Sequence, residues 1–108
     1  MALPIEPFSK KTDHNITGMG HGATVVGTAG VDVVLAASTA AKLVIIQAQT
    51  DNTSTIAVGG SGVDATVATG TGIVLYPGET LPLPVDNLAD VYIDALVSGE
   101  GVRYIYFT

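Results

Sequence analysis

The stretch VYIDALVSGEGVRYIYF, residues 91–107, decides the fold class of this chain. It holds two runs rich in valine, isoleucine and tyrosine, which are residues enriched in β-strands. Between the runs lies SGEG, residues 98–101, and a short glycine-containing segment in this position is typical of a hairpin loop. The stretch therefore predicts two β-strands joined by a tight hairpin connection.

The same alternation of apolar runs and turn residues continues outward from this stretch, back to residue 23. GGSG at residues 59–62 and Pro77-Gly78 are strong turn signals, and the second fits a type II turn with glycine where φ is positive. No helix of useful length is indicated, which excludes Rossmann-like and TIM-barrel folds. We expect an all-β chain, a single antiparallel β-sandwich of jelly-roll or immunoglobulin-like topology. Its eight short strands are expected at residues 23–27, 31–36, 42–48, 55–58, 73–76, 79–83, 91–97 and 102–107.

Several of these strands are apolar on both faces. LVII at residues 43–46 is continuous, and Tyr104 and Tyr106 alternate with Ile105 and Phe107. A strand with one face in water alternates between apolar and polar residues instead. We therefore expect a sheet that is covered by a second sheet on one face and by a neighbouring subunit on the other.

The composition also indicates subunit contacts. Hydrophobic residues make up 47% of the 108 residues and charged residues 13%, and the mean hydropathy is +0.48. A domain of this size has too little interior to bury so many apolar residues, and large exposed apolar patches usually mark interfaces. We expect a homo-oligomer; the alternative is an unusually Ala- and Val-rich monomer.

Residues 1–22 differ from the rest, because they contain two prolines, three glycines and both histidines. Proline favours extended backbone and removes a donor, so this segment is expected to be an extended N-terminal arm ahead of a sandwich domain at residues 23–108. Its apolar residues Leu3, Ile5 and Phe8 alternate with proline and glutamate and are candidates for contact with another subunit. The alternative is a disordered terminus.

Charge and sequence pattern exclude several partners. The net charge is −6 with four Lys and Arg residues, too few to neutralise many phosphates, so nucleic acid is not an expected partner. The most apolar region, residues 23–48, is interrupted by glycine and charged residues and does not predict a membrane span. The first residues do not resemble a signal peptide, and the absence of cysteine excludes disulfides and is compatible with cytosolic synthesis.

No catalytic or metal-binding constellation is found, so we expect neither an enzyme nor a cofactor. The two histidines, His14 and His21, lie in the expected arm and are seven residues apart, not the four that suit one helical face. A trimer could still gather three equivalent histidines on its axis. Asp94 lies in an expected strand and is predicted to face solvent or a subunit boundary. Asp32 and Asp90 also lie in or beside expected strands. The remaining acidic residues lie in expected loops or at their ends, where solvated surface charge is the simpler interpretation: Asp51, Asp64, Glu79, Asp86 and Glu100.

The part of the chain from residue 42 to residue 108 resembles small structural proteins of tailed bacteriophages. Four pieces carry the resemblance through their order and spacing. They are VGGSGV at residues 58–63, PGET at 77–80, DNLADVYIDA at 86–95 and SGEGV at 98–102. The N-terminal arm is not covered by it.

The resemblance implies a virion protein similar to capsid decoration (cement) proteins, made in the host cytoplasm and placed on the capsid surface. Such a protein would stabilise the head by bridging subunits of the major capsid protein as a homotrimer, with Leu3, Ile5 and Phe8 as arm contacts. The alternative is a β-module of the tail or a fibre that binds a host receptor or carbohydrate. Sugar sites need exposed aromatic residues, and Tyr76 beside the Pro77-Gly78 turn is the tyrosine expected to be exposed.

Overall fold

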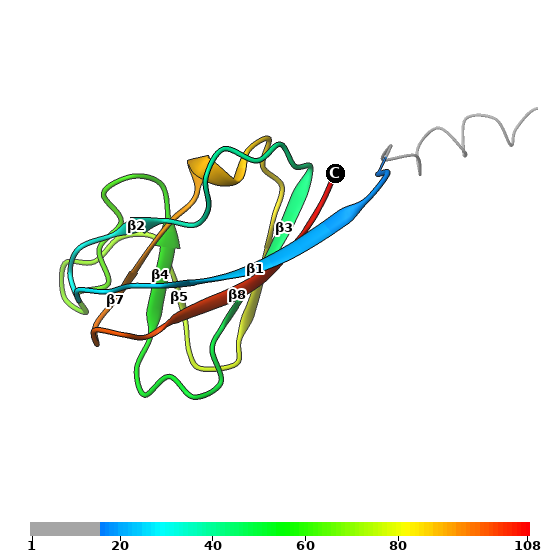
Figure 1. Ribbon diagram of the computed structural model, residues 1–108. Coiled ribbons are helices and arrows are strands. Elements are labelled where there is room, and N and C mark those ends of the chain that lie inside the picture. The colour runs from blue at the N-terminus through cyan, green and yellow to red at the C-terminus, as the bar shows by residue number, and fades with distance from the viewer. Residues whose placement is uncertain (1–15) are drawn as a thin grey trace, which may run out of the picture.

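Each of the eight expected stretches overlaps a strand, and together the strands build an all-β sandwich (Figure 1). The first strand begins at Met19, so it includes the last four residues of the segment expected as the arm. The structure is a computed structural model that describes residues 16–108. The strands are β1 (Met19–Val25), β2 (Val33–Val34), β3 (Leu43–Ala48), β4 (Ile56–Gly59), β5 (Ile73–Leu75), β6 (Thr80–Leu83), β7 (Tyr92–Ala95) and β8 (Gly101–Phe107). A short 3-10 helix, η1 (Leu88–Asp90), precedes β7. The expected antiparallel sandwich of about eight short strands is confirmed.

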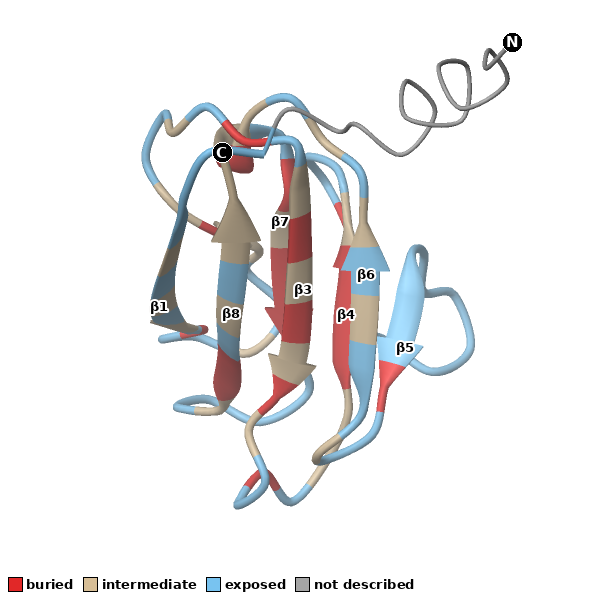
Figure 2. Cartoon of the chain, turned by 90° about the vertical axis from the view of Figure 1, so that its right-hand side faces the viewer, coloured by how far each residue is buried: buried red, intermediate tan, exposed pale blue. Residues whose placement is uncertain are grey.

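The strands form two antiparallel sheets of four. Sheet A has the order β1-β8-β3-β6, and sheet B has the order β2-β7-β4-β5. Figure 2 shows the sheets as two layers, with buried residues concentrated on β3, β4 and β7. Of the connections between consecutive strands, β4 to β5 stays within one sheet, and every other connection crosses from one sheet to the other.

The expected hairpin at residues 98–101 is wrong. β7 pairs with β2 and β4 in sheet B, whereas β8 pairs with β1 and β3 in sheet A, so the segment between them crosses the end of the sandwich. The reason is that Ile93 of β7 and Val102 of β8 are both fully buried in one core, which they enter from opposite sheets. A hairpin would have placed both strands in the same sheet.

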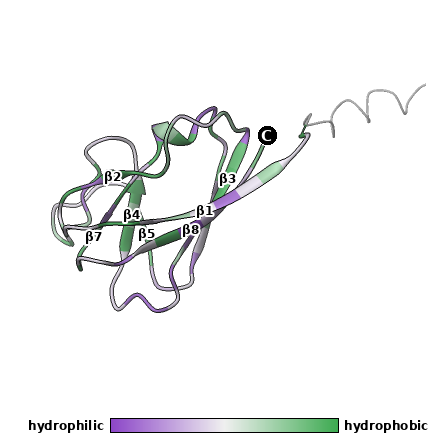
Figure 3. Cartoon of the chain, viewed as in Figure 1, coloured by the Kyte–Doolittle hydropathy of each residue, from purple (hydrophilic) through white to green (hydrophobic). Residues whose placement is uncertain are grey.

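The main core lies between the sheets. Every second residue of β3 points inward, so Val44, Ile46 and Ala48 are buried while the residues between them are half-buried. Figure 3 shows that β3 and β4 are hydrophobic over most of their length. Leu88 of η1 is also fully buried, so the 3-10 turn closes one end of this core.

The outer face of sheet B is covered by the chain's own loops. Val63 and Ala65, from the loop between β4 and β5, form a second buried cluster with Ala57 of β4, and Tyr92 of β7 packs against it. The two-sided character of β4 therefore comes from intramolecular covering and needs no neighbouring subunit.

Asp94 is buried in this second layer, so the expectation that it faces solvent or a subunit boundary is wrong. Its side chain is 1% exposed and accepts hydrogen bonds from the backbone N–H groups of Gly30 (3.1 Å) and Ala65 (2.9 Å). The carboxylate thus ties two loops to the outer face of β7. Burial is tolerated because each carboxylate oxygen has a hydrogen-bond donor.

The turn predicted at Pro77-Gly78 is confirmed. Gly78 has φ = 85°, and the N–H of Glu79 donates to the carbonyl of Tyr76 at 2.9 Å, as a type II turn requires. This turn carries the chain from β5 in sheet B to β6 in sheet A. It therefore connects the edge strand of sheet B to the edge strand of sheet A.

Candidate functional site

The outer face of sheet A is the candidate site, and its residues come from all four strands of the sheet. The register places His21 opposite Ile105 and Ile105 opposite Ile45, in one row across β1, β8 and β3. The side chains that alternate with the core residues form this face, which we call the A face. They are Met19, His21, Ala23 and Val25 of β1; Arg103, Ile105 and Phe107 of β8; Leu43, Ile45 and Gln47 of β3; and Thr80 and Pro82 of β6.

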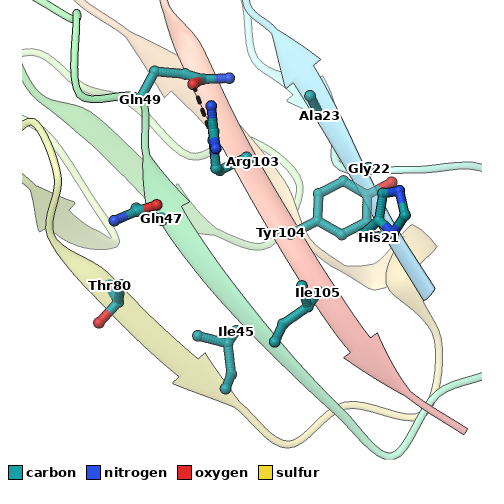
Figure 4. Close-up of a pocket in the computed structure, with 10 residues that line it drawn as sticks. All are labelled: His21, Gly22, Ala23, Ile45, Gln47, Gln49, Thr80, Arg103, Tyr104 and Ile105. Atoms are coloured by element: carbon teal, nitrogen blue, oxygen red, sulfur yellow. Dashed lines mark hydrogen bonds between the residues drawn. The ribbon is translucent and has the colours of Figure 1, made fainter. Parts of the chain in front are cut away.

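The A face contains an open hollow of about 590 Å³. Figure 4 shows Arg103 and Ile105 of β8 between Ile45 and Gln47 of β3 on one side and His21 on the other. The hollow is lined by His21, Gly22, Ala23, Ile45, Gln47, Gln49, Thr80, Arg103, Tyr104 and Ile105. A lining that combines apolar side chains with polar groups is typical of binding surfaces.

The two faces of the sandwich differ in how far they are covered. On the A face, Ile105 is 36% exposed and Met19 is 60% exposed, whereas Ala57 on the outer face of sheet B is 1% exposed. Apolar side chains of sheet A therefore remain in contact with solvent after the chain has folded. The expected neighbouring subunit over this face stays a prediction.

The A face also differs from the rest of the molecule in charge. Residues 16–108 contain eight acidic and two basic residues, and none of the acidic residues belongs to the A face. One of the two basic residues, Arg103, lies at its centre, where its Nε donates to Gln49 Oε1 at 3.3 Å. The face is thus an apolar, carboxylate-free surface with a cation on an otherwise acidic domain.

The residues singled out in the sequence have different places. Leu3, Ile5, Phe8 and His14 lie outside the described residues. His21 lies within β1 on the A face, opposite Ile105, rather than ahead of the first strand. Arg103 and Met19 were not singled out, although Arg103 is the charged residue that interrupts the apolar run of β8 and could have marked the exposed side of that strand.

The acidic residues expected in loops are in loops, and the carboxylates of Glu100, Asp64 and Glu79 accept hydrogen bonds from nearby backbone N–H groups. Two of them also have a lowered pKa. The carboxylate of Glu100 accepts hydrogen bonds from the backbone of Thr53 and Ser54, and these hold its pKa below the ordinary value of 4.5. The hydroxyl and backbone N–H of Thr66 similarly lower the pKa of Asp64 from 3.8. Both carboxylates therefore stabilise turns.

A second exposed apolar surface lies along β5 and the loop before it. Val67 is 86% exposed and Tyr76 is 61% exposed, and Ile73 and Val74 are also exposed. β5 pairs with β4 on one side only, so it is an edge strand of sheet B. We call these four residues, with the nearby acidic residues Asp64 and Glu79, the β5 edge. A hollow of about 290 Å³ lies among Asp64, Val67, Val74 and Tyr76.

No group of three or more His, Asp or Glu side chains could hold a metal ion among residues 16–108. The same residues contain no helix that is long and apolar enough to cross a membrane. The three strand tyrosines, Tyr92, Tyr104 and Tyr106, are half-buried, in contrast to Tyr76.

No known protein family, curated protein or solved structure matches this chain.

Proposed function

We propose that this chain is a structural subunit of a tailed-phage particle, a decoration protein that stabilises the head by bridging subunits of the major capsid protein. The observation that carries the structural-subunit part is the A face, which presents exposed apolar residues and no carboxylate on an acidic domain. The phage assignment rests on the sequence resemblance over residues 42–108.

The physical argument for a subunit is that the A face leaves apolar area in water that a partner could cover. Burial of apolar surface contributes about 25 cal/mol per Å², and a stable interface covers roughly 800 Å² on each partner. Association also costs translational and rotational freedom, so a single small contact is weak. Several simultaneous contacts to a lattice raise the effective affinity without any stronger individual contact.

The N-terminal segment supplies the proposed contact to the capsid. Leu3, Ile5 and Phe8 are the residues proposed to bind the major capsid protein, in a homotrimer placed at the capsid surface. β1 is an edge strand of sheet A, so a contact made by the residues that precede it does not require any change in the core.

The first experiment is the copy number of the protein in purified virions, measured by quantitative mass spectrometry against the major capsid protein. Hundreds of copies in a simple ratio to the capsid protein would support decoration. About a dozen copies would reject decoration in favour of a tail or fibre position, and complete absence would reject a virion protein altogether.

A binding assay then tests the contact itself. The full chain and a variant lacking residues 1–15 are mixed with undecorated capsids, and bound protein is measured after sedimentation. The truncation leaves β1 intact, because the strand begins at Met19. We expect weaker capsid binding with an unchanged circular dichroism spectrum. Full binding by the truncated chain would contradict the proposed role of Leu3, Ile5 and Phe8.

One observation favours a second candidate, a tail or fibre module that binds host carbohydrate. Tyr76 is exposed beside a hollow that also contains the polar residues Asp64 and Thr71, and an aromatic ring beside polar groups suits a sugar. A glycan array of the full chain tests this alternative, with Tyr76→Ala as the matched variant. A signal that Tyr76→Ala abolishes would support the module; no signal would reject it.

A further inference from the structure

We propose that copies of this chain associate head to tail, with the A face of one copy seated on the β5 edge of the next. The inference deepens the proposed function, because it rests on the chain being an assembling subunit and names the partner of the A face as a second copy. The observation behind it is that one molecule carries two exposed apolar surfaces whose charges have opposite sign.

The A face supplies the apolar and cationic side of the contact. Ile105 and Ile45 lie next to each other across β8 and β3, and Arg103 lies one row along the sheet, opposite Gln47. Arg103 is exposed and has one hydrogen bond from its Nε to Gln49. A guanidinium has five N–H donors, so this group can also bind a carboxylate of a partner.

The β5 edge supplies the apolar and acidic side. Val67 and Val74 are exposed around the second hollow, which Asp64 also lines. Glu79 is exposed at the turn that leads out of β5, where its Oε1 accepts from the N–H of Tyr76. Edge strands that protect themselves from association carry lysine or proline, and β5 (IVL) carries neither.

Opposite charge favours contact between unlike surfaces over contact between like surfaces. Two A faces placed against each other would bring two copies of Arg103 together, whereas an A face on a β5 edge brings Arg103 toward Asp64 and Glu79. A contact between two different patches of identical subunits is heterologous, and it forms a closed ring when the rotation between copies closes. A ring is also the form that the proposed trimer would take.

The test uses two variants of the full chain, each blocked on one surface. Ile105→Asp places a charge in the A face, and Val74→Asp places a charge in the β5 edge; both positions are exposed, so both variants are expected to fold. Val31→Asp makes the same change at an exposed position outside both surfaces and is the matched control. Mass is measured by size-exclusion chromatography with light scattering.

We expect the wild-type chain and Val31→Asp to be oligomers. Each blocked variant alone should associate at least about tenfold more weakly and elute as a monomer of 10.9 kDa. An equimolar mixture of the two should give a 1:1 heterodimer and nothing larger. The intact A face of the Val74→Asp variant can bind the intact β5 edge of the Ile105→Asp variant, and the two surfaces left free in that dimer are both blocked. Heterodimer formation from two monomeric variants is the outcome that only a head-to-tail contact gives.

Three outcomes would overturn the proposal. They are a monomeric wild-type chain, an oligomer that Ile105→Asp disrupts but Val74→Asp does not, and a mixture that stays monomeric. Circular dichroism checks that each variant folds. If Ile105→Asp does not fold, Arg103→Glu replaces it on the A face; if Val74→Asp does not fold, Val67→Asp replaces it on the β5 edge. A monomeric chain that still binds capsids would reject this contact and the proposed trimer but leave the proposed decoration of capsids standing. A head-to-tail oligomer that is absent from virions would support this contact and reject the proposed function.

Discussion

The side-chain amide of Asn52 pairs with the backbone of Gly101 in both directions. Its Nδ2 donates to the Gly101 carbonyl at 2.9 Å, and its Oδ1 accepts from the Gly101 N–H at 3.3 Å. Asn52 lies in the connection between β3 and β4, and Gly101 is the first residue of β8. The amide therefore bonds to the strand end as the backbone of a neighbouring strand would.

Loss of this pair should destabilise the sandwich. Asn52 is buried, so Asn52→Ala leaves the Gly101 N–H with no side-chain acceptor at a cost of about 1–3 kcal/mol in the free energy of unfolding. Asn52→Asp should cost more, because it replaces the donor Nδ2 with an oxygen that faces the Gly101 carbonyl. Urea denaturation measures both, and equal stability of Asn52→Asp and wild type would contradict the pairing.

Gly101 is also required for steric reasons. A Cβ at this position would lie 2.1 Å from the carbonyl oxygen of Thr24 in β1, and a backbone atom in a sheet cannot move aside cheaply. We expect Gly101→Ala to cost about 3 kcal/mol in the free energy of unfolding. Gly27→Ala is the matched control, because its Cβ would meet no atom within 4 Å, and it should change the same free energy by less than about 1 kcal/mol. Similar losses for the two variants would argue against the clash.

Asp94 should control how firmly the loops cover sheet B. Asp94→Asn replaces one acceptor oxygen by an NH₂ group that faces a backbone N–H, at a cost of about 1–3 kcal/mol. The amides of Gly30 and Ala65 should then exchange hydrogen faster, which NMR measures residue by residue. Asp90→Asn makes the same change at an exposed position and should leave both exchange rates unaltered.

Glu100 should make stability depend on pH in the acid range. The backbone N–H of Thr53 donates to its carboxylate and lowers its pKa in the folded chain below 4.5. A lowered folded pKa stabilises the chain above pH 4.5, and this contribution is lost as the pH falls through the folded pKa. The stability difference between wild type and Glu100→Gln should therefore shrink below pH 4.5, as thermal unfolding can show. A difference that stays constant would exclude this origin.

The strands and turns of this protein could be predicted because their causes are local. The type II turn at Pro77-Gly78 needs proline's fixed φ and a glycine with positive φ, and both are properties of the two residues themselves. The strand at residues 102–107 follows from β-branched and aromatic residues, and β8 differs from it by one residue at its start. Which strands pair was harder to predict. Two consecutive strands have the same sequence pattern whether they pair within one sheet or lie in opposite sheets of the sandwich.

The candidate site was also predictable only in those features that have local causes. Period-2 alternation assigns Arg103, Ile105 and Phe107 to one face of β8, and the sequence contains that information. The sequence does not show which face of a sheet is covered by other parts of the chain, because that depends on where distant loops lie. Val63 and Ala65 cover β4 because Asp94 of β7 binds the loop that carries them, across 29 positions of the chain.

The amino-acid sequence by itself determined an all-β chain of eight short strands and the acidic, cysteine-free surface chemistry. These depend on residue type and on neighbours a few positions away. Only the tertiary structure decided that β7 and β8 belong to opposite sheets, that Asp94 is buried and that the A face remains uncovered. Each of these depends on which apolar faces meet in the core, and that is a property of the whole packed chain.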